Sequence, residues 1–149
     1  MFGKRQDYAP FGKQACKQIA DSIAEAEKLT SGEIHVHVAE YSRENVMESA
    51  ALAFESLGMT KTRFRNGVLL FFATKDRKFA IIGDKGINDI VGQGFWDDAV
   101  SLIAKGFASG KPIEAVCEAI RLCGSKLSAN FPAEENEEDE LPNEVSFSK

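Results

Sequence analysis

The chain has 149 residues, of which 44% are hydrophobic and 28% charged, which suits a globular protein with one proper core. Seven acids and a single lysine give the C-terminal stretch 133–149 a net charge of −6, so the formal charge of −5 leaves +1 for the remainder. A nearly neutral body excludes an extended nucleic-acid-binding surface, which needs clustered Lys and Arg to neutralise phosphates. We expect one domain over residues 1–132 and an acidic, disordered tail over 133–149.

No segment reaches the roughly 20 apolar residues of a membrane span, and the N-terminus has no apolar centre of signal-peptide length. We therefore expect a soluble, cytoplasmic protein, and we also expect a monomer. Cys16, Cys117 and Cys123 lie in amphipathic helical patterns without a CxxC spacing. Reduced, buried thiols are favoured over a disulfide or a zinc site, because free Cys commonly packs as a small apolar side chain.

The first half of the chain alternates helical and extended patterns. Apolar residues at steps of three and four predict an amphipathic helix over 11–29, which Gly32 helps to end. Residues 33–40 alternate as a strand does, and a second helical pattern covers 44–57. A strand, a helix and a strand in this order form a right-handed crossover, so the first two strands should be parallel.

The centre of the chain predicts an antiparallel hairpin. Residues 68–73 are an unbroken apolar run, a polar turn follows around Asp76, and the apolar pattern resumes over 78–82. The glycine-punctuated segment 85–94 predicts a loop after the hairpin.

Two further helical patterns complete the domain, over residues 95–107 and 112–131, with Pro112 suited to a first helical turn. We expect Trp96 to pack in the core or to line a cleft, with the core favoured. Helices outnumber strands and can cover both faces of a small mixed sheet. The sequence therefore predicts an α/β fold.

Strand direction determines at which end of the sheet each polar residue lies. If the second strand is parallel to the first and antiparallel to the third, Glu33, Asn66 and Asp84 share one end of the sheet. Asp76 then falls at the opposite end, roughly 25 Å away.

The predicted loop can bring Asp89 and Asp97 toward Glu33 and Asp84. Calcium and magnesium select such an oxygen-only environment, so we predict that these four acids bind a divalent cation. The spacing leaves a second interpretation open, in which the acids are solvated at helix starts and stabilised by the helix macrodipole.

His35 and His37 share one strand face, which is how a strand presents two imidazoles to zinc or iron. A third soft ligand is missing, since these are the only histidines and no cysteine is predicted nearby. We favour the interpretation that both lie under a helix or on a solvated face.

Four short segments carry a resemblance to a known family. They are Thr-Ser-Gly-Glu at 30–33, Arg-Asn-Gly-Val-Leu-Leu at 65–70, Asp-Arg-Lys at 76–78 and Gly-Asp-Lys-Gly at 83–86. Their order and spacing resemble the TPM domain over about residues 11–132. That family includes a thylakoid lumen protein implicated in photosystem II repair and described as an acid phosphatase.

The resemblance implies a three-layer α/β/α sandwich and, in some members, calcium or magnesium bound by acidic residues in loops at one end of the sheet. Glu33, Asp84 and Asp97 match motif acids, and Asp89 is adjacent. The chain departs from the common form at residues 83–85, where many members carry Gly-Tyr-Gly.

Two other functions remain open. The first is a metal-assisted phosphomonoesterase, in which the cation polarises a phosphoryl oxygen, with Lys85 and Arg65 as candidate phosphate contacts and no nucleophile identified. The second is a protein-interaction module, in which Leu141, Val145 and Phe147 dock on the body or on a partner such as a chaperone or membrane-protein complex. The usual role of such an acidic run is solubility, which we favour.

Overall fold

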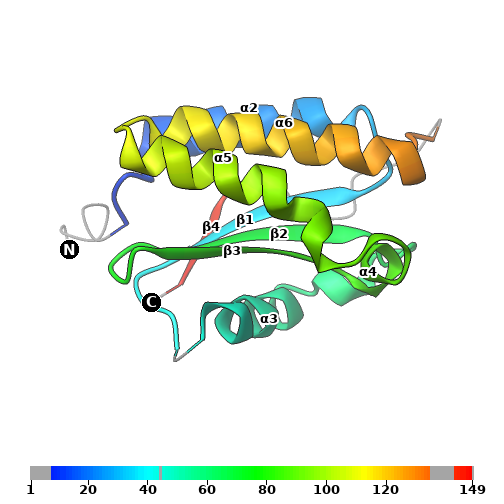
Figure 1. Cartoon of the computed structure of the whole chain (residues 1–149), viewed down its shortest axis with the longest axis horizontal. Helices are drawn as coiled ribbons and strands as arrows, with labels where there is room; N and C mark the ends of the chain where they lie inside the picture. Colours follow the sequence, from blue (N-terminus) through cyan, green and yellow to red (C-terminus); the bar gives the residue numbers. More distant parts are fainter. Residues whose placement is uncertain (1–7, 44, 135–142, 149) are drawn as a thin grey trace.

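Figure 1 shows the fold of the chain in a computed structural model that describes residues 8–43, 45–134 and 143–148. Its elements are, in chain order, α2 (Lys13–Glu27), β1 (Glu33–Ala39), α3 (Val46–Ser56), the 3₁₀ helix η1 (Met59–Lys61), β2 (Gly67–Ala73), β3 (Lys78–Gly83), α4 (Lys85–Val91), the 3₁₀ helix η2 (Gln93–Trp96), α5 (Asp97–Ala108), α6 (Pro112–Asn130) and β4 (Ser146–Ser148).

The described strands form one mixed sheet in the order β3-β2-β1-β4. β1 is parallel to β2, with Glu33 opposite Gly67, and β2 is antiparallel to β3, with Val68 opposite Gly83. The predicted crossover and hairpin are therefore confirmed. The directions of these three strands also place the entries of β1 and β2 at the same end of the sheet as the exit of β3.

Helices cover both faces of the sheet, which gives three layers (Figure 1). α2, α5 and α6 pack on one face, over a core that contains Val36, Leu70 and Ile120. α3 packs on the other face, over a core that contains Leu69 and Phe71. Because β2 is buried on both faces, it is apolar along its whole length rather than alternating. The predicted α/β sandwich is confirmed.

The segment after β3 differs from the sequence prediction. The predicted loop over 85–94 is wrong for most of its length, because α4 covers Lys85–Val91 and η2 begins at Gln93. The Asp84 carboxylate accepts the Lys85 N–H at 2.7 Å, which caps the helix. Gly86 is needed for close approach, since a Cβ there would lie 2.3 Å from the carbonyl oxygen of Phe64. Gly92, at φ +76°, then follows the helix.

The C-terminal end of the acidic stretch lies on the domain. β4 is parallel to β1, and Val145 and Phe147 pack against the larger core. The ring of Phe147 also meets Tyr8 edge-on at 4.9 Å between centroids. The sequence leaves open whether this end docks on the body or on a partner. Val145 and Phe147 dock on the body. Leu141 and the rest of 135–142 lie outside the described residues.

Two of the three cysteines and the tryptophan are buried as the sequence predicts, whereas Cys16 is half-buried. No disulfide links the three cysteines, all of which lie in described segments, and Cys117 and Cys123 are buried. Burial raises the pKa of the Cys123 thiol to about 12. Trp96 is fully buried in the larger core. None of the described helices combines the length and apolarity that crossing a membrane requires.

Candidate functional site

Three polar residues meet where β1 and β2 begin and β3 ends, and we call Glu33, Asn66 and Asp84 the carboxylate rim. The Asp84 N–H donates to the carbonyl oxygen of Gly67 at 2.9 Å, and the Glu33 N–H donates to that of Asn66 at 3.4 Å. Glu33 and Asp84 therefore flank the first residues of β2 from its two sides. This is the arrangement that the predicted strand directions require.

Asp84 is buried, and its carboxylate already has a positive partner. Arg65 donates from Nε to Oδ2 at 2.7 Å and from Nη2 to Oδ1 at 2.8 Å, a bidentate pair. The carboxylate raises the pKa of Arg65 above its ordinary value, so the guanidinium stays cationic. Arg65 holds this position with a left-handed backbone at φ +51°. In this structure, the charge of Asp84 is balanced from within the protein.

Asn66 is fully buried and only partly satisfied. Its Nδ2 donates to Ser31 Oγ at 3.2 Å, whereas its Oδ1 has no hydrogen-bond partner in the described part of the chain. A buried amide oxygen without a partner costs roughly 1–3 kcal/mol, so such an atom calls for an explanation. A bound cation at the rim would supply one, because amide oxygens are ligands for hard cations.

Glu33 lines a second acidic feature that the sequence reasoning missed. A groove of about 370 Å³ beside it is also lined by Glu27 and Glu134, together with Lys28. Glu27 ends α2 and accepts the Ile34 N–H at 2.8 Å. Its position as the last helical residue before the turn into β1 is the sequence signal that could have identified it. Glu134 carries no such local signal.

The other two predicted ligands lie on the helices that follow β3. Asp89, on α4, pairs with Lys85 at 3.1 Å, and both side chains are exposed. Asp97 is exposed at the start of α5. Within the described ranges, no three His, Cys, Asp or Glu side chains are grouped so that they could hold a metal ion. The structure brings Glu33 and Asp84 to one rim and leaves Asp89 and Asp97 facing solvent.

His35 and His37 are buried beside the C-terminal strand. Ser146 Oγ lies 2.8 Å from His35 Nε2 and 2.6 Å from His37 Nδ1, and Ser148 Oγ lies 2.8 Å from His37 Nε2. Burial and the neighbouring His35 lower the pKa of His37 from 6.5 to about 4. His37 is therefore neutral at pH 7. The serines of β4 contact both imidazoles, whereas the sequence predicts that the pair lies under a helix or on a solvated face.

Comparisons with known proteins agree with this architecture. The family model of the TPM domain matches residues 7–125, a range that contains the whole carboxylate rim. The NMR structure of the BA42 protein from the psychrophilic bacterium Bizionia argentinensis is similar, with 40% sequence identity and a TM-score of 0.84. That similarity covers 91% of this chain and 93% of the BA42 chain. The search of curated proteins gave no match.

Proposed function

The chain belongs to the TPM domain family, and from this premise we propose that it binds a divalent cation, calcium or magnesium, at the carboxylate rim. One observation carries the proposal: the buried Oδ1 of Asn66, the residue before β2, has no partner in the described part of the chain, and Glu33 and Asp84 lie at the same end of the strands that pair with β2. Oxygen atoms of these kinds form the ligand sets of calcium and magnesium. The family resemblance, with its acidic residues at one end of the sheet, points to the same class of ligand.

Each member of the rim has a role in this proposal. Glu33 and Asp84 supply negative charge, and Asn66, the residue before Gly67, supplies a neutral oxygen. Asp89 and Asp97, on the neighbouring helices, are the acids that would complete the ligand set. The bound cation would tie the ends of three strands to α4 and α5, so its main effect would be on stability and local order.

Arg65 should act as an internal competitor of the cation. Its guanidinium occupies both carboxylate oxygens of Asp84, at 2.7 and 2.8 Å. A cation at the rim must share these oxygens or displace Arg65, which is 44% exposed and has room to move. Arg65→Asn should therefore bind calcium more tightly than the wild type, because Asn tolerates the left-handed backbone and carries no charge.

Calorimetric titration with calcium and magnesium, together with the melting temperature, tests the proposal. We expect saturable binding that raises the melting temperature, is weakened by Glu33→Gln and Asp84→Asn, and is strengthened by Arg65→Asn. Asp21→Asn is the matched control, because Asp21 is an exposed acid on α2, paired with Lys17. If neither metal gives heat and the melting temperature does not change, the proposal is wrong.

We rank a phosphomonoesterase below cation binding. Arg65 and Lys85, the cations expected to contact a phosphate, are each paired with a carboxylate, Asp84 and Asp89. Nothing at the rim identifies a nucleophile. Turnover of p-nitrophenyl phosphate that survives stringent purification and disappears in Asp84→Ala would reverse this ranking.

A further inference from the structure

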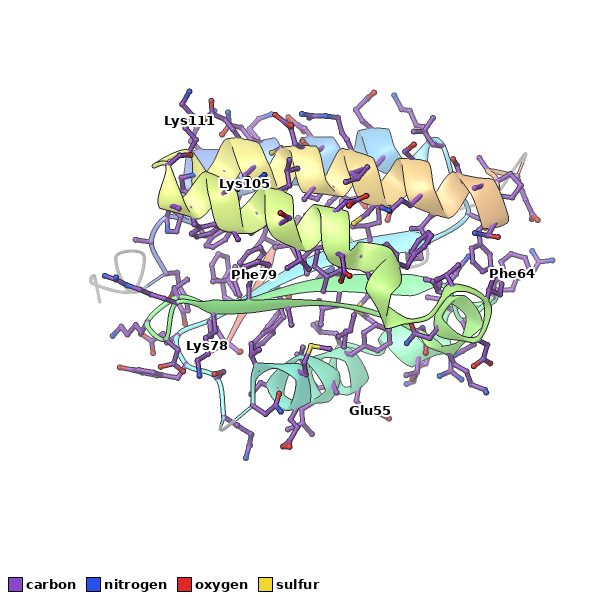
Figure 2. All side chains as sticks on the ribbon, in the orientation of Figure 1. Glu55, Phe64, Lys78, Phe79, Lys105 and Lys111 are labelled. Atoms are coloured by element: carbon purple, nitrogen blue, oxygen red, sulfur yellow. The ribbon has the colours of Figure 1, made fainter. Side chains whose placement is uncertain are left out.

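A groove lies at the end of the sheet opposite the carboxylate rim, and the proposed cation site does not use it. It has a volume of about 520 Å³ and lies between the turn of the β2–β3 hairpin, the C-terminal half of α5 and the segment that leads into α2. This volume is in the range of natural small-molecule sites. Figure 2 shows Phe79 between β3 and α5 at this end of the molecule.

The inner wall of the groove is aromatic. The ring of Phe72 stacks with Phe79 at 5.8 Å and with Phe107 at 5.9 Å between centroids, and Phe11 lies 5.0 Å from Phe72. Phe107 remains 39% exposed, so one side of this ring set is open to solvent. An apolar surface that is both concave and open suits the apolar body of a small ligand.

The polar part of the lining is positively charged. Arg77 and Lys78 line the groove, and no Asp or Glu of the described residues does so. Both side chains are exposed, and neither forms an ion pair or hydrogen bond with another described side chain. Lys78 precedes Phe79 on β3 and points to the other face of the sheet, so Arg77 is the cationic group beside the apolar wall. This arrangement complements an anion with an apolar body.

The backbone of Arg77 belongs to the hairpin turn, where its N–H donates to the carbonyl oxygen of Thr74 at 3.3 Å. Arg77 has φ +54°, a left-handed conformation that Gly or Asn adopts with less strain. The only other described non-glycine residue with positive φ is Arg65, at φ +51°, and its guanidinium holds the Asp84 carboxylate. Each end of the hairpin thus carries a strained arginine. One binds an anion of the protein, and the other lies at the open groove.

We propose that this groove binds a small organic anion, namely a carboxylate with an alkyl or aromatic body. The body packs against Phe72, Phe79 and Phe107, and the carboxylate binds Arg77. This site is separate from the carboxylate rim and is expected to bind its ligand with or without calcium.

Titration of the ¹⁵N-labelled chain with sodium decanoate, followed by NMR, tests this inference. We expect saturable shifts of amides in 72–79 and 104–108, and no saturable shifts with decyltrimethylammonium, which has the same body and the opposite charge. Arg77→Gly should weaken decanoate binding about tenfold while leaving the melting temperature equal or higher, because glycine relieves the left-handed backbone. Ala104→Trp, which fills the groove, should abolish binding.

Lys61→Gln is the matched control, since Lys61 is an exposed cation in η1, away from the groove. This variant should bind decanoate as the wild type does. Lys78→Gln removes a charge at the edge of the groove and should weaken binding less than Arg77→Gly does. Equal affinity in Arg77→Gly, Lys78→Gln and the wild type would overturn the inference, as would decanoate shifts confined to another surface. Binding of anionic vesicles without binding of monomeric decanoate would overturn it too.

Discussion

Mild acid should destabilise the folded chain through His37. Burial and the charge of His35 lower the pKa of His37 from 6.5 to about 4 in the folded state. In the unfolded chain its pKa returns to about 6.5, so below that pH the unfolded state binds more protons than the folded state. The contribution of His37 is therefore fully present above about pH 6.5 and is lost as the pH falls toward about 4.

The size of the effect follows from the shift. A change from 6.5 to about 4 corresponds to about 3 kcal/mol when the loss is complete, and to about 2 kcal/mol at about pH 5. His37 is only 6% exposed, so solvent screening reduces this value little. The loss should appear first at β4, because Ser146 and Ser148 contact the imidazole.

Urea unfolding between about pH 7.5 and about pH 5 measures this loss, and hydrogen exchange of the β4 amides reports where it begins. His35 and His37 are the only histidines in the sequence, so few other side chains titrate in this window. His37→Gln, which cannot titrate, should be less stable at pH 7 and much less sensitive to pH. If this variant and the wild type lose the same free energy between these pH values, the reasoning about His37 is refuted.

Two further predictions concern packing. Gly86→Ala should lower the free energy of unfolding by about 3 kcal/mol, despite the better helix propensity of Ala, because its Cβ would meet a backbone oxygen at 2.3 Å. Gly12→Ala, where nothing lies within 4 Å, should lower it by about 1 kcal/mol or less, because Ala is a poorer N-cap than Gly, and equal melting temperatures for the two variants would contradict the packing argument. Half-buried Cys16 should react with a thiol reagent in the native state. Cys123 is buried and its pKa is raised to about 12, so it should react only after unfolding. Equal reaction rates for the two thiols would contradict the described burial.

The relative directions of β1, β2 and β3 could be predicted from the sequence because they depend on local patterns. The alternation over 33–40, the apolar run over 68–73 and its resumption over 78–82 are each visible within a few residues. The helical spacing between the first two strands then fixes their relative direction. The placement of Glu33 and Asp84 at one end of the sheet follows directly from these directions.

Features that depend on tertiary contact could not be predicted. The sequence predicts that Gly86 lies in a loop, because no local pattern indicates that the backbone of Phe64 and Arg65 packs closely against it. The pairing of Arg65 with Asp84 depends on a left-handed backbone that arginine adopts infrequently.

Local sequence patterns also could not predict the hydrogen-bond partners of the two histidines. Ser146 and Ser148 contact His37 across 109 and 111 positions of the chain. The three-residue strand that carries them follows an acidic run whose usual role is solubility. A contact of this kind becomes visible only once the sheet is assembled.

The most direct test of cation binding at the carboxylate rim is an NMR titration with calcium chloride that follows the side-chain amide of Asn66. We predict that this resonance shifts on saturation together with the backbone amides of Glu33, Gly67 and Asp84, and that Asp84→Asn removes the shifts. An Asn66 side chain that does not respond, while exposed acids such as Glu48 show the only changes, would contradict the account.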